Sequence, residues 1–146
     1  MPSNKRLVVR KSKLPGAGHG LFTNVAFQRG ERIVEYKGRI QPWNEVKDQD
    51  GHNGYLLRLD RSTAINALLY RKSPGRYAND AAGFARVKGL HNNAEYLIYG
   101  NRCFICATRS IAPGQEILVG YGKEFWALKK RIQEATHKGT RVPTGR

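Results

Sequence analysis

The sequence predicts a single, mostly β domain with turns throughout. Runs of β-branched and aromatic residues are short and are bounded by glycine or by charged turns. Only one long stretch, near the C-terminus, has apolar residues at helical spacing. With 146 residues, 40% of them hydrophobic, the chain is long enough to bury one core, and it contains no repeat or low-complexity tract.

Seven stretches have the composition of strands, because they are rich in Val, Ile, Leu and Tyr and end at turn residues. They are residues 7–12, 32–40, 54–60, 62–68, 94–100, 103–111 and 116–122. Within the second stretch, Tyr36-Lys37-Gly38 is expected to end a strand.

Two segments predict helix. Residues 42–50 indicate one short helical turn. Residues 123–136 indicate the C-terminal helix, since Phe125, Leu128 and Ile132 recur at three- and four-residue spacing.

The stretch "GAGHGLF", residues 16–22, has three alternate glycines, which would let a backbone approach a ligand closely. A dinucleotide-binding fingerprint would have to follow a strand and open a helix, whereas a turn and a strand follow here. A Rossmann site is therefore excluded. Taken alone, these glycines favour a bulged loop.

The stretch "SPGRYANDAAGF", residues 73–84, opens with a turn signal and places Asn79 and Asp80 after an apolar dipeptide. Asn and Asp are unfavourable inside helices and strands because their side chains compete for backbone groups. A simple turn is the plainer interpretation, and a ligand-facing polar pair is the alternative.

Cys103 and Cys106 form a C-x-x-C pair within a predicted strand. No second pair of cysteines or histidines completes a zinc site. Residues three apart in a strand face opposite ways, so a disulfide is disfavoured. We therefore expect buried free thiols and no metal.

The charge balance is strongly basic. Lysine and arginine number 26 against 11 aspartates and glutamates, a net charge of +15, with basic clusters at both ends of the chain. Such a surface attracts phosphate polymers, which favours contact with nucleic acid or chromatin. An equal alternative is that the basic residues form a solvated face that only keeps the protein soluble. No apolar run reaches the length of a membrane span and no secretory signal is present, so we expect an intracellular protein.

Four stretches occur in an informative order: "GHGLF", "YKG", "RYANDA" and "PGQEILVGYG", with "NNAEY" after the third. Together they resemble the SET-domain protein lysine methyltransferases over residues 7–126. The resemblance implies a SET fold of several small β-sheets with a C-terminal pseudoknot and a short C-terminal helix. It implies one SET domain over residues 1–128, followed by a basic helix end and tail over 129–146.

The resemblance also implies S-adenosylmethionine as cofactor and a protein lysine as substrate. The implied cofactor-binding residues are Ala17, Gly18, His19, Gly20, Arg76, Asn79 and Asp80. Tyr36 and Tyr96 match the aromatic walls of the lysine channel. Tyr121 matches the catalytic tyrosine beside the reacting nitrogen, and the pseudoknot is expected to bring it close to Asn79.

The chain departs from the family at Asp80, where a histidine is usual. It also lacks the family's cysteine-rich flanking modules, and Phe125 or Trp126 would have to cover the cofactor. Two alternatives to an enzyme stay open: a SET-like module without activity, and a basic β module that binds nucleic acid or chromatin.

A histone or other chromatin protein is the substrate that the resemblance suggests, with a nuclear location in a eukaryote and a cytoplasmic one in a bacterium. Since a basic tail would be repelled, either acids such as Glu45, Asp48 and Asp50 line the peptide groove, or nucleosomal DNA recruits the enzyme. The sequence does not indicate an oligomeric state.

Overall fold

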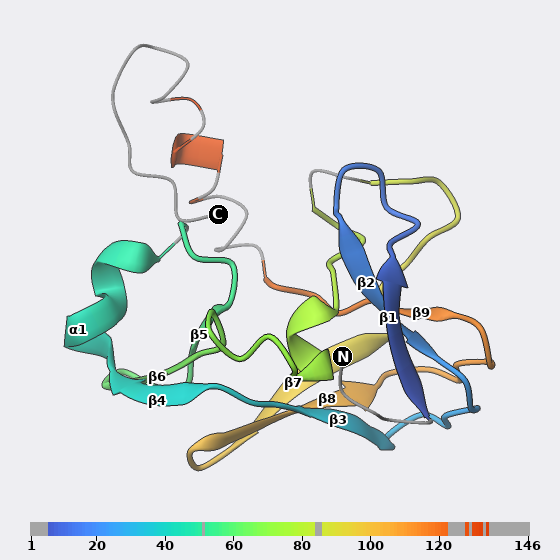
Figure 1. The fold of residues 1–146 in the computed structure, drawn as a ribbon, viewed down its shortest axis with the longest axis horizontal. Helices are drawn as coiled ribbons and strands as arrows, with labels where there is room; N and C mark the ends of the chain where they lie inside the picture. The colour runs from blue at the N-terminus through green and yellow to red at the C-terminus, as the bar shows by residue number, and fades with distance from the viewer. Residues whose placement is uncertain are drawn as a thin grey trace.

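The described part of the chain contains three antiparallel sheets of three strands each, in line with the several small sheets that the resemblance implied (Figure 1). The structure is a computed structural model that describes residues 6–50, 52–83, 86–122, 128, 130–132 and 134. The strand orders are β1-β2-β9, β3-β8-β7 and β4-β6-β5. Strands greatly outnumber helices in these residues, so the predicted fold class is confirmed.

The first sheet pairs β1 (Leu7–Lys11) with β2 (His19–Thr23), and β2 with β9 (Glu116–Ile117). The prediction of a bulged loop over residues 16–22 is wrong from residue 19 onward, where strand β2 begins. Leu21 and Phe22 are buried, and this burial together with the pairing to β1 outweighs the glycine content. Position 20 suits a glycine because a Cβ there would collide with the side chains of Glu116 and Ser12.

The second sheet places β8 (Arg102–Ala107) between β3 (Arg32–Tyr36) and β7 (Ala94–Tyr99). Cys103 and Cys106 on β8 are free and buried, so the prediction of buried free thiols is confirmed. Burial raises the pKa of the Cys103 thiol to about 12, which keeps it protonated at neutral pH.

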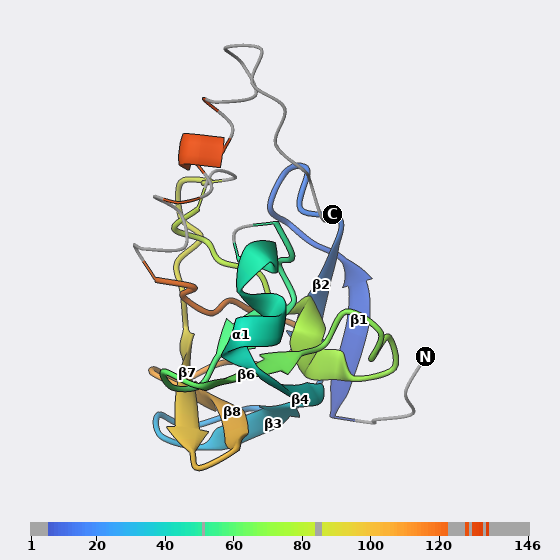
Figure 2. The same ribbon diagram turned by 90° about the vertical axis from the view of Figure 1, so that its left-hand side faces the viewer.

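The third sheet contains β4 (Arg39–Pro42), β6 (Thr63–Asn66) and β5 (Leu56–Arg58). The chain passes from β3 into this sheet at Gly38, where a Cβ would lie 2.7 Å from the Asn66 backbone. The predicted helical turn follows β4 as α1 (Trp43–Val46) and the 3-10 turn η1 (Lys47–Gln49). Helix α1 packs against β4 and β6 at one end of the molecule (Figures 1 and 2).

The segment after β9 runs between two distant parts of the chain. Val119 N donates to the Asn79 carbonyl at 2.8 Å, and the Leu118 carbonyl accepts from Asn93 N at 2.8 Å and Ala94 N at 3.0 Å. The C-terminal strand therefore passes between the two ends of the loop over residues 80–92. This is the crossing that the resemblance implied. Ladder pairing is limited to Glu116–Ile117, with single parallel bridges beyond it, so the strand is shorter than predicted.

Of the predicted C-terminal helix, residues 128, 130–132 and 134 are described, and they are helical. Phe125, Trp126 and the basic tail after residue 134 lie outside the described residues. No helix in the described ranges has the length and apolar character needed to span a bilayer.

Candidate active site

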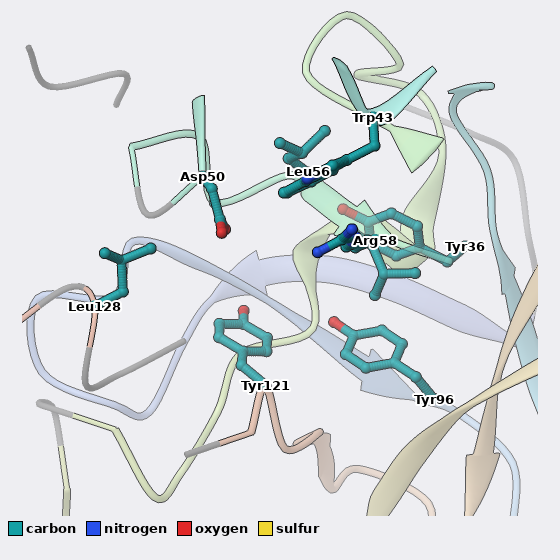
Figure 3. Close-up of a pocket in the computed structure, with 10 residues that line it drawn as sticks. Tyr36, Trp43, Asp50, Leu56, Arg58, Tyr96, Tyr121 and Leu128 are labelled. Carbon is teal, nitrogen blue, oxygen red and sulfur yellow. The ribbon is translucent and has the colours of Figure 1, made fainter. Parts of the chain in front are cut away.

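Three tyrosines from distant parts of the sequence line one cavity of about 330 Å³ (Figure 3). Tyr36 ends β3, Tyr96 lies on β7, and Tyr121 follows the crossing segment. The structure thus brings together the three residues that the sequence assigned to a lysine channel and to catalysis.

The tyrosine rings are arranged as two neighbouring pairs. The rings of Tyr36 and Tyr96 meet edge to face, with centroids 5.7 Å apart and planes at 88°. Those of Tyr96 and Tyr121 stack, at 6.4 Å and 24°. The hydroxyls of Tyr96 and Tyr121 point to the same side in Figure 3. These contacts form an aromatic wall with polar tips, which suits a long apolar side chain that ends in a nitrogen.

Backbone carbonyls fix two of the hydroxyls. Tyr36 Oη donates to the Tyr55 carbonyl at 2.7 Å, and Tyr121 Oη donates to the Ala78 carbonyl at 2.7 Å. Burial is the largest cause that raises the pKa of Tyr36 and of Tyr96 well above their ordinary value. These two hydroxyls therefore stay neutral at any physiological pH.

The glycine loop and the "RYANDA" stretch meet through one hydrogen bond. Asn79 Nδ2 donates to the His19 carbonyl at 2.9 Å, and the His19 ring lies edge-on to Tyr77 at 6.4 Å. Gly18 has φ +72° and Gly20 lies at the start of β2, with Ala17 directly before them. The predicted loop residues and Asn79 are thus neighbours in space.

Arg76 lies on the 3-10 turn η2 (Pro74–Tyr77), with its guanidinium 3.8 Å from the centroid of the Tyr55 ring. Its Nη1 donates to the carbonyls of Ala67 at 2.9 Å and Leu68 at 2.8 Å. Its Nε is buried and has no hydrogen-bond partner within the described residues. The side chain is held rigidly and keeps one buried N–H available for an acceptor.

The side chain of Asp80 points into the protein and does not face a ligand site. It is 5% exposed, and its carboxylate accepts hydrogen bonds from within the protein. Only its backbone is left as a candidate contact for a cofactor.

Other lining residues of the cavity were not foreseen from the sequence: Trp43, Gly54, Leu56, Leu57, Arg58 and Leu128. Most come from α1, β5 and the turn between them, and the Arg58 guanidinium stacks on Trp43 at 4.4 Å. The available signal was the isolated tryptophan in "QPWNEV", a stretch that by itself predicts only a short helical turn. Of the acids expected at the groove, Asp50 lines the cavity, whereas Glu45 and Asp48 are exposed on α1 and η1.

Within the described ranges, no cluster of three or more histidine, cysteine or acidic side chains could hold a metal ion.

Comparison with known proteins identifies sequences and a fold that are similar to this chain. The family model described as "SET domain" matches residues 18–122. The chain is 29% identical to the histone-lysine N-methyltransferase EZH2 of Chaetomium thermophilum, over 89% of this chain and 9% of that protein. It is 31% identical to the N-lysine methyltransferase KMT5A of Xenopus tropicalis, over 78% of this chain and 36% of that protein. The chain therefore spans well under half the length of these relatives.

Among solved structures, the fold matches the methyltransferase domain of human PR domain-containing protein 2. The TM-score is 0.59 at 20% identity, over 82% of this chain and 78% of that one. At this identity the match concerns the fold alone.

Proposed function

Because this chain belongs to the SET-domain family, we propose that it is a protein-lysine N-methyltransferase that uses S-adenosylmethionine. The observation that carries the proposal is the cavity walled by Tyr36, Tyr96 and Tyr121 beside the chain crossing. A wall of this kind accepts a lysine side chain along its length and a nitrogen at its end.

The residues that the resemblance assigns to the cofactor do not line this cavity, but their chemistry fits S-adenosylmethionine. Gly18 has φ +72° with no atom within 4 Å of the position of a Cβ, so the loop offers bare backbone to a ligand. The buried Nε of Arg76 is a charged donor suited to a carboxylate. His19, Asn79 and the backbone of Asp80 lie on adjoining segments. Bound S-adenosylmethionine would supply a methyl group on a positively charged sulfur, which departs as a neutral thioether.

The channel must receive the lysine as a neutral amine. A lysine with pKa about 10.4 is neutral at pH 7 in only about one molecule in 2,500, so deprotonation costs about 4.6 kcal/mol. An aromatic wall with neutral hydroxyls disfavours the ammonium form and lowers this cost. No dedicated base is then required, and alignment and desolvation carry most of the rate.

Tyr121 is suited to orient the amine. Its hydroxyl hydrogen is given to the Ala78 carbonyl, so its oxygen can accept an N–H from the substrate. The nitrogen lone pair is then directed away from Tyr121. This assigns Tyr121 a catalytic role in holding the reacting nitrogen.

The proposed substrate is a lysine in a chromatin protein, since relatives carry the names of histone-lysine methyltransferases. The net charge of +15 opposes a basic peptide, but Asp50 at the cavity provides local attraction. The decisive experiment is methylation of a lysine peptide array with labelled S-adenosylmethionine, paired with calorimetric titration of the cofactor. Absence of cofactor binding would contradict the proposal. Binding without transfer to any peptide would favour a module without activity.

Substitution Gly18→Val is expected to weaken cofactor binding at least about tenfold, because a branched side chain would both strain the positive φ and occupy the open space. Calorimetric titration measures the effect. Gly30→Val is the matched control, since Gly30 also has a positive φ and open space but lies in the turn before β3. Equal affinities in the two folded variants would remove the glycine loop from the site.

Substitution Tyr96→Phe is expected to raise the number of methyl groups transferred, from mono- or dimethylation by one further step. Tyr96 stacks on Tyr121 at the end of the channel, and beside them Val119 is small and fully buried, so the Tyr96 hydroxyl limits the room at the nitrogen. Mass spectrometry of the product peptide measures the degree. Tyr99→Phe, on the exposed end of β7, should leave it unchanged. A Tyr96→Phe product identical to wild type would refute this role.

A further inference from the structure

The carboxylate of Asp80 receives three N–H groups at the chain crossing. Oδ2 accepts from Tyr121 N at 2.8 Å, and Oδ1 accepts from Ala82 N and from Asn92 Nδ2, both at 2.8 Å. Asn92 is itself fixed, because its Oδ1 accepts from Ala81 N at 2.8 Å. A buried carboxylate with three good donors is a strong, charge-assisted anchor.

The backbone of Tyr121 lies in a stretch where an anchor of this kind matters. It stands between Gly120 and Gly122, and Gly122 has φ +96°. Glycine leaves the backbone on both sides with wide conformational freedom. The ladder of β9 ends at Ile117, and the last parallel bridge is at Val119.

Two bonds from one short segment therefore hold Tyr121 at both ends. Asp80 binds its backbone N–H, and the Ala78 carbonyl accepts its hydroxyl at 2.7 Å. The ring is clamped between them and stacks on Tyr96. Small displacements of a group that orients a reacting atom are costly, since about 1 Å can reduce a rate about 10²-fold.

We propose that Asp80 is a positioning residue that fixes the backbone of Tyr121 so that its hydroxyl faces the reacting nitrogen; this role rests on the function proposed above. A histidine cannot provide the same anchor, because a neutral imidazole has one acceptor nitrogen and the carboxylate receives three donors here. The aspartate at position 80 thus supports the channel tyrosine, and is no sign of a lost site.

The geometry predicts how an amide would behave at this position. In Asp80→Asn, a single oxygen must serve donors on two sides. Two of them, Ala82 N and Asn92 Nδ2, lie on the Oδ1 side, so the amide oxygen stays there and its NH₂ faces Tyr121 N. The bond to Tyr121 is lost.

A reciprocal exchange should restore that bond. In Asp80→Asn/Asn92→Asp, the carboxylate at position 92 accepts from the new amide and from Ala81 N. The amide oxygen at position 80 is then free to turn toward Tyr121 N. Ala82 loses its acceptor, but it is exposed and can bind water.

The test combines steady-state kinetics on the best peptide of the array with amide hydrogen exchange at Tyr121 measured by NMR. For Asp80→Asn we expect kcat to fall about 10- to 100-fold, KM to change less than about twofold, and Tyr121 N–H to lose protection. The double exchange should recover both kcat and protection. If the role of Asp80 were purely structural, the double exchange would not selectively restore the protection of Tyr121 N–H. The fall in kcat would then follow the loss of thermal stability.

Three results would overturn the proposal: Asp80→Asn with wild-type kcat, Asp80→Asn with a protected Tyr121 amide, or a folded double exchange that recovers neither. If Asp80→Asn does not fold, amide hydrogen exchange in the wild-type protein tests the proposal. The proposal requires that Tyr121 N–H exchange far more slowly than the N–H groups of Gly120 and Gly122. If wild type methylates no peptide, the proposed function fails, while the exchange measurement still tests the hold of Asp80 on Tyr121.

Discussion

Tyr121→Phe is expected to lower the rate of methyl transfer by about 10²- to 10³-fold, the size typical of a lost transition-state hydrogen bond. The substitution removes one hydroxyl and almost no volume. The phenyl ring can keep its stacking on Tyr96 and the backbone bond to Asp80. The lost group is therefore the oxygen that accepts the amine N–H.

The fold should tolerate this change. The Ala78 carbonyl is buried and loses the hydroxyl donor, which costs about 1–3 kcal/mol of unfolding free energy. Cofactor affinity should stay near wild type, because the glycine loop, Arg76 and Asn79 are unchanged.

Single-turnover kinetics with saturating cofactor measure the rate, and calorimetric titration measures the affinity. Tyr70→Phe is the control, since Tyr70 is exposed and does not line the cavity. A Tyr121→Phe enzyme with the full rate would refute the proposed mechanism.

The local elements of the fold could be predicted because each is encoded in a short stretch. The β-branched and aromatic composition of β3 and β8 and the end of a strand at Tyr36-Lys37-Gly38 depend on neighbouring residues, and these elements were found where expected. Strand β2 was missed because its glycines weaken the local preference, and only pairing with β1 and the burial of Leu21 and Phe22 reveal it.

The crossing could not be derived from periodicity, since it joins Asn79 and Asn93 to Leu118 and Val119 by contacts between distant segments. Only the ordered set of motifs pointed to it. The same holds for the tyrosine cavity, whose three rings come from three separate elements. Trp43 and Arg58 were missed because the pattern gave no indication that α1 and β5 would border that cavity.

Asn93→Ala is expected to be the most destabilising single substitution among those discussed. Asn93 is 8% exposed and lies at the crossing. Its Nδ2 donates to the Glu116 carbonyl at 2.9 Å, and its Oδ1 accepts from Leu118 N at 2.9 Å. Alanine would leave both buried backbone groups without their partner.

At about 1–3 kcal/mol for each buried group left unpaired, the loss in unfolding free energy is about 2–6 kcal/mol. A domain of this size has a total of only about 5–15 kcal/mol, so a large fraction of the variant could be unfolded at 37 °C. Urea unfolding followed by circular dichroism measures the loss, and Asn44→Ala, exposed on α1, is the matched control. Since Asn93 holds one edge of the crossing strand at Glu116 and Leu118, its removal should loosen Tyr121 as well and lower the methylation rate. A midpoint equal to that of Asn44→Ala would mean that the backbone bonds of Leu118 and Val119 hold the crossing without the Asn93 side chain.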